Sequence, residues 1–442
     1  MAMGEARTKE PTRQIAMVCL EELVPGDDRY RRIDAMVSDW GFVREAARPY
    51  YSEGIGRPSV DPTVLLKLML AGALEGIGST RELLRVADLR LDLRLFLGYG
   101  LGERLPAHQT ISEAQTQRFA DGDVFERLFL RTVALCKQHG LIEGSHLSVD
   151  GFHAEANAAL RSLRASLEPI VGEAAGECEP EQAPAPEPPQ LRLAEPRSGP
   201  TPRRKATNAT VASTSDPDAR LKGKPGQRPH LVYRGHVAVD PKKRCVAGCL
   251  GERAEGHEGD ALAPLLDRAR FVLPELASVG ADQGFAAERV WQNTAERAIV
   301  AHIPPQKTML PREGREPRTN AQRLALAAKE RARSDAGVWA YRRRMADAEG
   351  VIAELKNLHG LDRVRCRGTP AFHVQLLLGC TAINLKRLAK HAPTAHQGVA
   401  AARKTAPTAP TSDDRRLDPA AQRPSSRFSR HQLVWTVKLC LN

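Results

Sequence analysis

The chain has 442 residues, of which 42% are hydrophobic, so it can bury at least one sizeable core in about two or three structural units. This composition excludes a fibrous protein. Lys and Arg outnumber Asp and Glu by 65 to 53, and the net charge of +12 favours a polyanionic partner such as nucleic acid, although basic runs are as often solvated faces or tails.

The N-terminus and the cysteines bear on the cellular compartment. The first residues, MAMGEARTKEPTRQ, are charged and lack an apolar core, which argues against a signal peptide. The longest apolar run, TVLLKLMLAGALEGIG, is broken by Lys67 and is too short to span a bilayer. Cys245 and Cys249 lie in an apolar run, which favours core packing over zinc binding. We therefore expect a protein of the reducing cytoplasm, near the nucleoid if its partner is DNA, and no membrane partner.

Residues 1–125 are predicted to form a helical domain. Asp61 followed by Pro62 matches the N-cap and first position of a helix. The stretches STRE (79–82) and TISE (110–113) each match a capping box. Short helices of this kind are compatible with a helix-turn-helix unit that reads DNA, although most helical bundles bind no DNA.

Two later segments are too polar to pack a core. Residues 166–208 are rich in Pro, Ala and Glu, which predicts a flexible insert. Residues 391–442 are basic and rich in Pro and Ala, and we expect a disordered tail there. Residues 126–165 and 209–390 are expected to form a second domain on either side of the insert.

The second domain contains the strand patterns. Five short apolar runs predict strands at 145–150, 233–240, 244–250, 277–282 and 298–303, with DPKK as the hairpin turn between the second and third. Helices are predicted at 260–276, with Asp260 as its N-cap, at 286–296, and at about 320–358. This order is that of an α/β (α+β) ribonuclease-H-like fold, whose mixed sheet carries carboxylates at the ends of the first and fourth strands.

Asp150 and Asp282 occupy the ends of those two predicted strands. A single Asp at a strand end is usually a turn or cap residue, but two at matching positions favour a shared site. A third acid is then expected from the last helix. Turning each residue by about 100° places Tyr341, Arg344, Glu349 and Lys356 within an arc of roughly 140° that also carries the apolar stripe. On the same count, Asp347 and Glu354 fall on the opposite, solvated face.

Several motifs in order now resemble one family. LSVDGFHAEANA, STSDPDARLKGKPG, GADQGF and the Tyr341, Arg344, Glu349 and Lys356 series resemble the motifs of bacterial insertion-sequence transposases of the DDE type. In these, an InsH-like helical domain precedes a ribonuclease-H-like catalytic domain, and GRPSVDPTVLLKLMLAGALEGIGSTREL resembles the former. The resemblance runs from about residue 30 to about residue 390, with gaps in the insert.

The resemblance implies a function and its site. Asp150, Asp282 and Glu349 would be catalytic and would hold two Mg²⁺ or Mn²⁺ ions, about 4 Å apart, for cleavage and transfer of DNA strands. The partner would be double-stranded DNA, held by a dimer or larger complex. Arg344 and Lys356 would contact phosphates and Tyr341 would position DNA, unless these side chains only pack or form ion pairs.

Other residues keep two interpretations. Arg220, Lys222 and Lys224 follow STSDPDA and would hold the DNA backbone or form an ordinary basic turn. His153 and Glu155 would share one strand face and Asp150 the other, which argues against a local metal cluster.

Phe152 and His153 depart from the residues that usually follow this motif in relatives, and Gly350 follows the third acid where Pro or His is common. The long tail also leaves two other functions open. One is a decayed or co-opted DNA-binding protein without catalysis, and the other is a metal-dependent nuclease that does not rejoin strands.

Overall fold

A computed structural model describes residues 17–51, 59–114, 119, 122–165, 208, 211–223 and 228–391. The predicted insert (166–208) and tail (391–442) therefore lie outside the described residues, apart from Asn208 and His391. Lys224 lies outside them as well.

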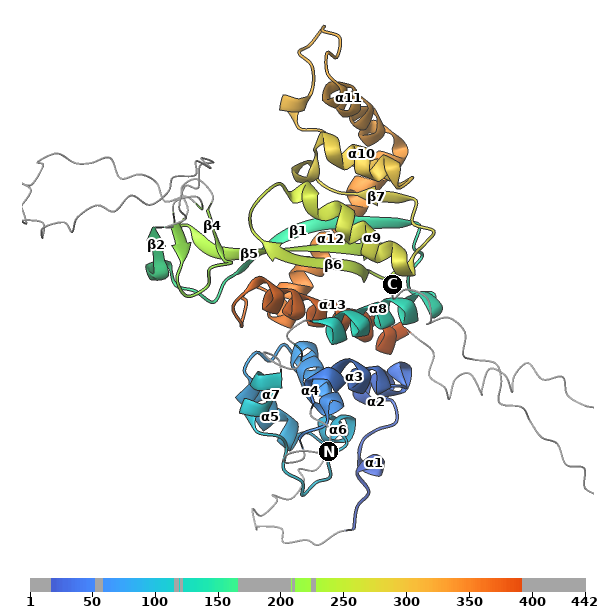
Figure 1. Ribbon diagram of the computed structural model, residues 1–442. Helices are drawn as coiled ribbons and strands as arrows, with labels where there is room; N and C mark the ends of the chain where they lie inside the picture. Colours follow the sequence, from blue (N-terminus) through green and yellow to red (C-terminus); the bar gives the residue numbers. More distant parts are fainter. Residues whose placement is uncertain are drawn as a thin grey trace, which may run out of the picture. The chain divides into compact units, whose positions relative to one another are not determined.

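The N-terminal part of the chain is helical, as predicted (Figure 1). Its helices are α1 (Leu20–Leu23), α2 (Arg29–Val37), α3 (Gly41–Ala47), η1 (Arg48–Tyr50), α4 (Pro62–Glu75), α5 (Thr80–Leu89), α6 (Leu91–Leu97), α7 (His108–Glu113) and α8 (Asp123–Gln138). α4 is buried on nearly all sides, because its neighbours α3, α5 and α6 pack around it. Within the described residues no single helix is long and apolar enough to cross a membrane, although the bent pair of α4 and α5 passes that test together.

Two of the three helix starts predicted in the N-terminal domain are confirmed. The Asp61 carboxylate accepts a hydrogen bond from the Thr63 amide at the start of α4. Ser79 likewise accepts from the Glu82 amide at the start of α5. The capping box expected at 110–113 is wrong, because α7 begins two residues before Thr110, directly after the extended Ala107. Thr110 is therefore inside the helix.

A mixed sheet forms the centre of the second part. It contains β1 (His146–Glu155), β4 (Arg220–Lys222), β5 (His230–Asp240), β6 (Cys245–Arg253), β7 (Ser278–Gly280) and β8 (Val300–His302). The strands lie side by side in the order β6, β5, β1, β7 and β8. β4 pairs with the first residues of β5, His230–Val232. β7 and β8 run parallel to β1, whereas β5 is antiparallel to its neighbours.

All five predicted strands exist, and three short ones were not predicted. β2 (Leu163–Ala165), β3 (Val211–Ser213) and β4 have three residues each, too few to show an alternating pattern. β2 and β3 pair with each other in a separate ribbon.

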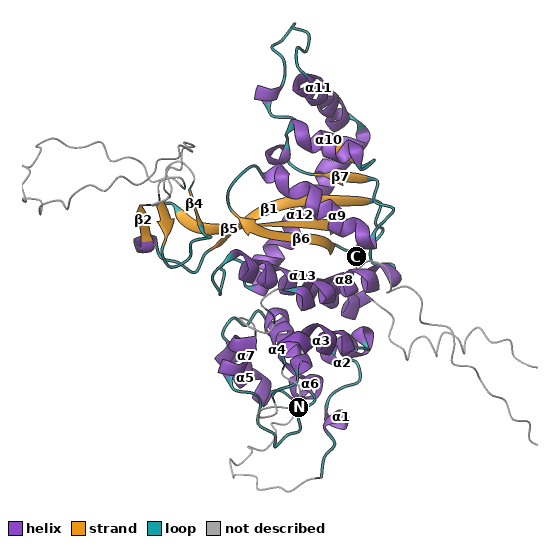
Figure 2. Ribbon diagram, viewed as in Figure 1, coloured by secondary structure: helices purple, strands orange, loops and turns teal. Residues whose placement is uncertain are grey.

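Helices cover both faces of the sheet (Figure 2). α9 (Leu262–Val272) packs on one face, where Leu265 lies against Gly248. α12 (Asp335–His359) and α13 (Thr369–His391) pack on the other, where Phe372 lies against Gly251. α10 (Glu288–Glu296) joins β7 to β8, and α11 (Asn320–Arg333) follows β8. Short turns of 3₁₀ helix are η3 (Leu160–Ser162), η4 (Glu258–Ala261), η5 (Gln283–Phe285) and η6 (Lys307–Met309).

The long helical region predicted at 320–358 is two helices. Ser334 caps α12 by accepting a hydrogen bond from the Gly337 amide. A Cβ atom at Gly337 would lie 2.0 Å from the Arg331 carbonyl oxygen, so only glycine allows α12 to start so close to the end of α11.

Hydrogen bonds to distant segments of the chain fix α13 on the sheet. Asn384 accepts a hydrogen bond from the Val246 amide and donates one to the Val246 carbonyl oxygen, which satisfies the backbone of the edge strand β6. At the other end of α13, Asp218 accepts from the amide and the hydroxyl of Thr369. The STSDPDA motif therefore holds the start of α13.

The predicted N-cap at Asp260 is wrong. Asp260 lies inside η4 and pairs with Arg289, and His257 caps this turn by accepting from the Gly259 amide. The N-cap is three residues earlier than the pattern suggests, because an imidazole nitrogen accepts this hydrogen bond as a carboxylate would.

Candidate active site

Asp150 and Asp282 come from neighbouring parallel strands. β1 pairs with β7 up to Ser148 and Gly280, and each Asp lies two residues beyond that last pair. Asp150 is on the face that α12 covers, because it pairs with Arg344 of α12. Gly280 faces α12 as well, since a Cβ atom there would lie 3.4 Å from the Ala340 Cβ, and the charge of Asp282, two residues later, acts on Asp150. Asp150 is not at a strand end, however, because β1 continues along β5 to Glu155. Only its pairing with β7 has ended.

The turn after β7 orients Asp282. Its backbone remains extended and its carboxylate accepts a hydrogen bond from the Gly284 amide, which starts η5. Asp282 therefore has the cap role that a single strand-end Asp usually has, in addition to its place beside Asp150.

Arg344 joins the first and third predicted acids. Its guanidinium donates to the Asp150 carboxylate at 2.7 Å and to the Glu349 carboxylate at 3.2 Å. Arg344 is buried, whereas the Glu349 side chain is 51% exposed. The two acids thus share one cation at the edge of the covered face.

The surroundings of Asp150 disfavour its charge. Burial raises the pKa of Asp150 to about 6, while Arg344 and the Gly151 amide act to lower it. The negative charges of Asp282 and Glu349 raise it further. Asp150 is therefore in electrostatic contact with both other acids, and a bound cation would stabilise its ionised form.

The predicted environment of Asp347 is wrong. Asp347 is fully buried and pairs with Arg343 at 2.9 Å and Arg244 at 3.3 Å. Burial raises the pKa of Asp347 despite these two arginines. Glu354 is also paired, with Arg387 and His359, and its pKa falls to about 2 against the effect of burial. α12 has packing partners on several sides, so a single apolar stripe does not define its buried face.

The remaining predicted DNA contacts are spread over two elements. Tyr341 is exposed on α12, 5.6 Å from the Arg344 guanidinium. Lys356 lies two turns after Glu349, with its ammonium 5.5 Å from the Phe152 ring. Lys222 and Arg220 are both on β4, where Arg220 pairs with Glu255 at 2.6 Å. The structure thus brings Tyr341 and Arg344 together, and places Arg220 and Lys222 beside the first residues of β5.

One acid near the site was not predicted. A Cβ atom at Gly284 would lie 2.8 Å from the Glu258 carboxylate and 3.0 Å from that of Asp282, so these two carboxylates flank the same glycine. Glu258 is in η4, in the connection between β6 and α9. No local pattern distinguishes it from a solvated turn residue, since only the fold brings that connection beside β7.

The donor set suits a hard divalent cation, but the acids are not gathered around one. Within the described ranges, no three His, Cys, Asp or Glu side chains lie close enough together to hold a metal ion. Arg344 supplies positive charge between Asp150 and Glu349 instead. Carboxylate oxygens are the ligands that Mg²⁺ and Mn²⁺ prefer, and the raised pKa of Asp150 marks a carboxylate short of positive charge. The residues therefore fit such an ion in chemistry.

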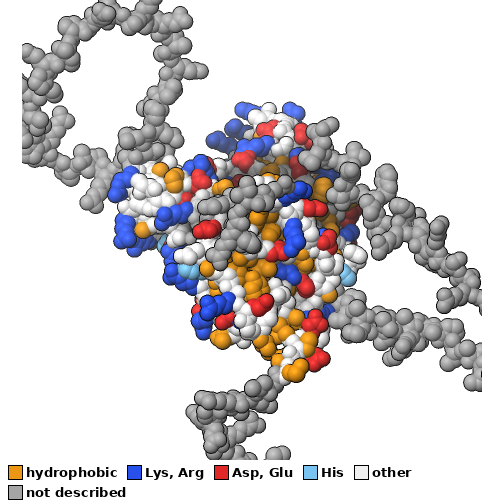
Figure 3. All heavy atoms as spheres, turned by 60° about the horizontal axis from the view of Figure 1, so that its bottom comes forward, with side chains coloured by type: hydrophobic (Ala, Val, Ile, Leu, Met, Phe, Trp, Pro, Cys, Tyr) orange, Lys and Arg blue, Asp and Glu red, His pale blue; other side chains and the backbone are white. Residues whose placement is uncertain are grey.

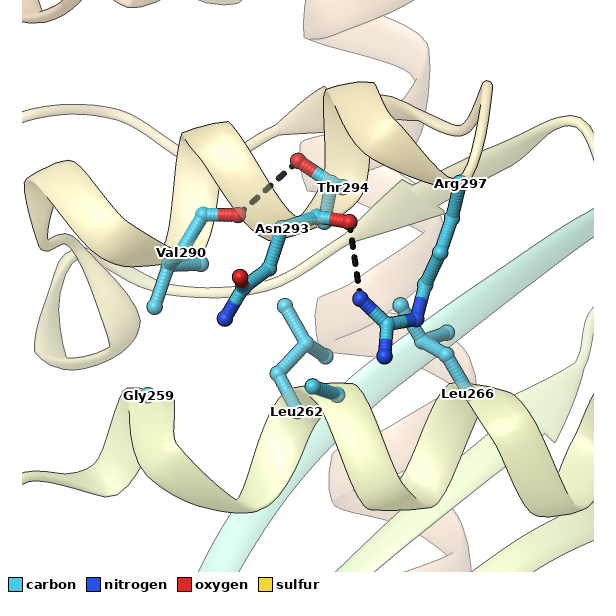
Figure 4. Close-up of a pocket in the computed structure, with 8 residues that line it drawn as sticks. Gly259, Leu262, Leu266, Val290, Asn293, Thr294 and Arg297 are labelled. Atoms are coloured by element: carbon cyan, nitrogen blue, oxygen red, sulfur yellow. Dashed lines mark hydrogen bonds between the residues drawn. The ribbon is translucent and has the colours of Figure 1, made fainter.

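A pocket elsewhere in the molecule is not part of this site. It lies between α9 and α10, and it is lined in part by Leu262, Leu266 and Val290 (Figure 4). Two of its polar side chains are occupied, because Thr294 donates to the Val290 carbonyl and Arg297 to the Asn293 carbonyl. This pocket is a packing gap between two helices.

Comparison with protein families identifies both parts of the chain. A family model described as a transposase domain (DUF772) matches residues 18–117. A second, described as a transposase DDE domain, matches residues 201–385, and together the two cover more than half of the chain. No curated protein and no solved structure gives a significant match. With the motifs and the strand order above, these matches show that the chain belongs to the insertion-sequence DDE transposases.

Proposed function

We propose that this chain cleaves and joins DNA strands at the ends of an insertion sequence, with Asp150, Asp282 and Glu349 as its catalytic acids. The observation that carries the proposal is the parallel register of β1 and β7, which sets Asp150 and Asp282 side by side on the face that carries α12. A ribonuclease-H-like fold is part of this proposal. The order of β6, β5, β1, β7 and β8 and their directions support it.

The three carboxylates would hold two Mg²⁺ or Mn²⁺ ions. Such ions, when bound, activate the attacking hydroxyl and stabilise the leaving oxygen at a phosphodiester. Asp282 is oriented for this by the Gly284 amide, and Asp150 by the Gly151 amide at 2.8 Å. Glu349 can turn toward the site because half of its side chain is free in solvent.

Arg344 would have two functions in turn. Without a metal ion its guanidinium neutralises Asp150 and Glu349. With DNA and metal ions bound, its planar fork suits a bidentate contact to a phosphate. Tyr341, which is exposed about one turn before Arg344 on α12, would support the DNA next to that phosphate.

The net charge of +12 supports double-stranded DNA as the partner. Two ends of one element must be cut and joined, which favours an oligomer on DNA. We also propose that the protein acts in the cytoplasm, on the nucleoid.

A cleavage assay tests the proposal. The full chain is incubated with Mg²⁺ and linear DNA that carries the ends of the surrounding element, and nicked and joined products are resolved. Asp150→Asn should reduce cleavage by at least about 10³-fold, equivalent to about 4 kcal/mol, and retain DNA binding. Glu155→Gln is the matched control, since Glu155 is an exposed acid on the same strand but on its other face.

Equal cleavage by Asp150→Asn and the wild type would contradict the assignment of the acids. DNA binding by the wild type without any cleavage would instead make the chain a DNA-binding protein that has lost catalysis. Cleavage without joining would make it a nuclease.

A further inference from the structure

In the described part of the chain, one edge of β1 has no partner strand beyond the end of its pairing with β7. β7 pairs with β1 only up to Ser148. At the other end, Glu155 is bridged to Arg363 in the segment that follows α12. Among the described residues, no strand pairs with this edge between 149 and 154. The free edge of β1, defined as residues 149–154, therefore starts at the candidate active site and leads away from it.

Cationic groups lie on both sides of the free edge. On the face of α12, the Lys356 ammonium is 5.5 Å from the ring of Phe152. On the opposite face, His153 is exposed and pairs in register with Arg234 of β5. Lys222, on β4, lies farther along the same face. Lys356 and Lys222 form no ion pair within the part of the chain that the structure describes.

The charges around His153 are not balanced. Partial burial and then the positive charges of Lys222, Arg234 and Lys356 lower the pKa of His153 to about 4. Glu252, on β6, is occupied by Arg234 at 2.6 Å and by His236 at 3.1 Å. Among the described residues neither lysine pairs with an acid, and Glu155 is an exposed carboxylate on the same face of β1 as His153. His153 stays neutral near pH 7 and keeps a ring N–H that can donate to an anion.

The surface agrees with this arrangement. In Figure 3, Lys and Arg side chains gather on the left, the side on which β2 and β4 lie in Figure 1. Lys356, two turns after Glu349, and Lys222, on β4 across β5 from β1, both place positive charge at His153. Such a pair of cations is complementary to the phosphates of a DNA backbone, whereas an apolar or basic partner would leave the lysines unpaired.

We infer that the DNA backbone held at Asp150 continues over the free edge of β1, with successive phosphates contacted by Lys356, His153 and Lys222. This inference rests on the proposed function and adds the direction in which the DNA leaves the acids. It also gives His153 a binding role, as a neutral donor to one phosphate between two lysines.

Salt dependence of DNA binding tests the inference. Binding of the full chain to a labelled duplex is measured without divalent ions over a range of salt concentrations. Each phosphate neutralised by a lysine contributes about 0.9 to the slope of log K against log salt. Lys222→Ala and Lys356→Ala should each lower that slope by about 1. Lys243→Ala is the matched control, an exposed lysine in the turn between β5 and β6.

His153 has its own expected result. His153→Ala should weaken binding several-fold with an unchanged slope, because a neutral donor displaces no counterion. His153→Lys should restore binding and raise the slope by about 1. His153 is exposed, so these variants keep the core intact.

The failure of this inference differs from the failure of the proposed function. Wild-type DNA binding with the same slope in Lys222→Ala, His153→Lys and the Lys243→Ala control would overturn the path over the free edge and leave the catalytic acids in place. A wild-type chain that neither binds nor cleaves DNA would overturn both.

Discussion

The two halves of β1 differ in what surrounds them. In the first half, His146–Val149 are all buried, and His146–Ser148 pair with β7. In the second half, Asp150–Ala154 pair with β5 on one side only, and His153 and Glu155 are exposed. The first half of this strand is therefore part of the core, and the second half carries the polar residues of the candidate site. The change occurs at Asp150, where β7 ends.

The difference teaches where a fold can place reactive groups. The first half is buried, and Ser148 pairs with β5 and β7 at once, which satisfies its backbone groups and leaves little room for a ligand. A strand that is longer than one of its neighbours is still held in position by the other neighbour, and the edge beyond the shorter strand is free. The backbone of Asp150 is held in place by its pairing with β5, and its carboxylate lies where β7 no longer blocks a ligand.

The largest expected effect is the difference in stability lost when a buried side chain of the first half and an exposed side chain of the second half are removed. Leu147 is fully buried, so Leu147→Ala should destabilise the protein by about 2–5 kcal/mol through lost burial and a new cavity. His153→Ala, in the open half, should change stability by less than about 0.5 kcal/mol. Denaturant unfolding measures both. Equal losses would mean that the two halves are equally enclosed.

The second effect is a pH dependence to which His146, in the first half, and His153, in the second half, both contribute. Burial, with His302 and Arg343, lowers the pKa of His146 from 6.5 to about 4. The unfolded chain thus binds this proton first, so stability should fall as the pH drops from about 6.5 to about 4, by up to about 3 kcal/mol. Unfolding at several pH values measures this. His146→Gln should flatten the profile, and an unchanged profile would assign the loss to other groups.

The third effect concerns the cation that links β1 to α12. Arg344→Met leaves Asp150 and Glu349 without their shared guanidinium, which should cost about 1–3 kcal/mol in the absence of divalent ions. Mg²⁺ should then raise the Tm of the variant more than that of the wild type. A chelator should remove this difference. An equal Mg²⁺ response in both proteins would contradict a cation site at these acids.

The smallest effect separates two acids on α12. Asp347 is buried between arginines, and Asp347→Ala should cost about 1 kcal/mol. Glu349 is half exposed, and Glu349→Ala should change stability by less than about 0.5 kcal/mol while abolishing cleavage. Unfolding curves and the cleavage assay are read together. Loss of cleavage from Asp347→Ala alone would reverse the two assignments.

Much of the fold was predictable because its signals are local. The five main strands alternate or are apolar throughout, and Asp61 and Ser79 mark helix starts with side chains that cap them. The strands β2, β3 and β4 and the break at Ser334 were not predicted. β4 forms by pairing with β5, β2 and β3 form by pairing with each other, and a close approach at Gly337 forms the break.

The candidate site was only partly predictable, for the same reason. Strand order placed Asp150 and Asp282 together, and helical spacing placed Glu349 near them. The burial of Asp347 depends on Arg244, and the position of Glu258 depends on a connection beside β7. Both are contacts between segments far apart in the chain, which no local pattern encodes.

The sequence by itself determined the order of the main strands and helices and the family, and it named the three candidate acids, because periodicity and ordered motifs depend on neighbouring residues. Only the tertiary structure decided that Asp150 lies within β1 and not at its end, that Arg344 joins it to Glu349, and that the strand continues with a free edge. The physical reason is that β7 is shorter than β1. The length of a neighbour, and not the strand's own residues, sets where an edge becomes free.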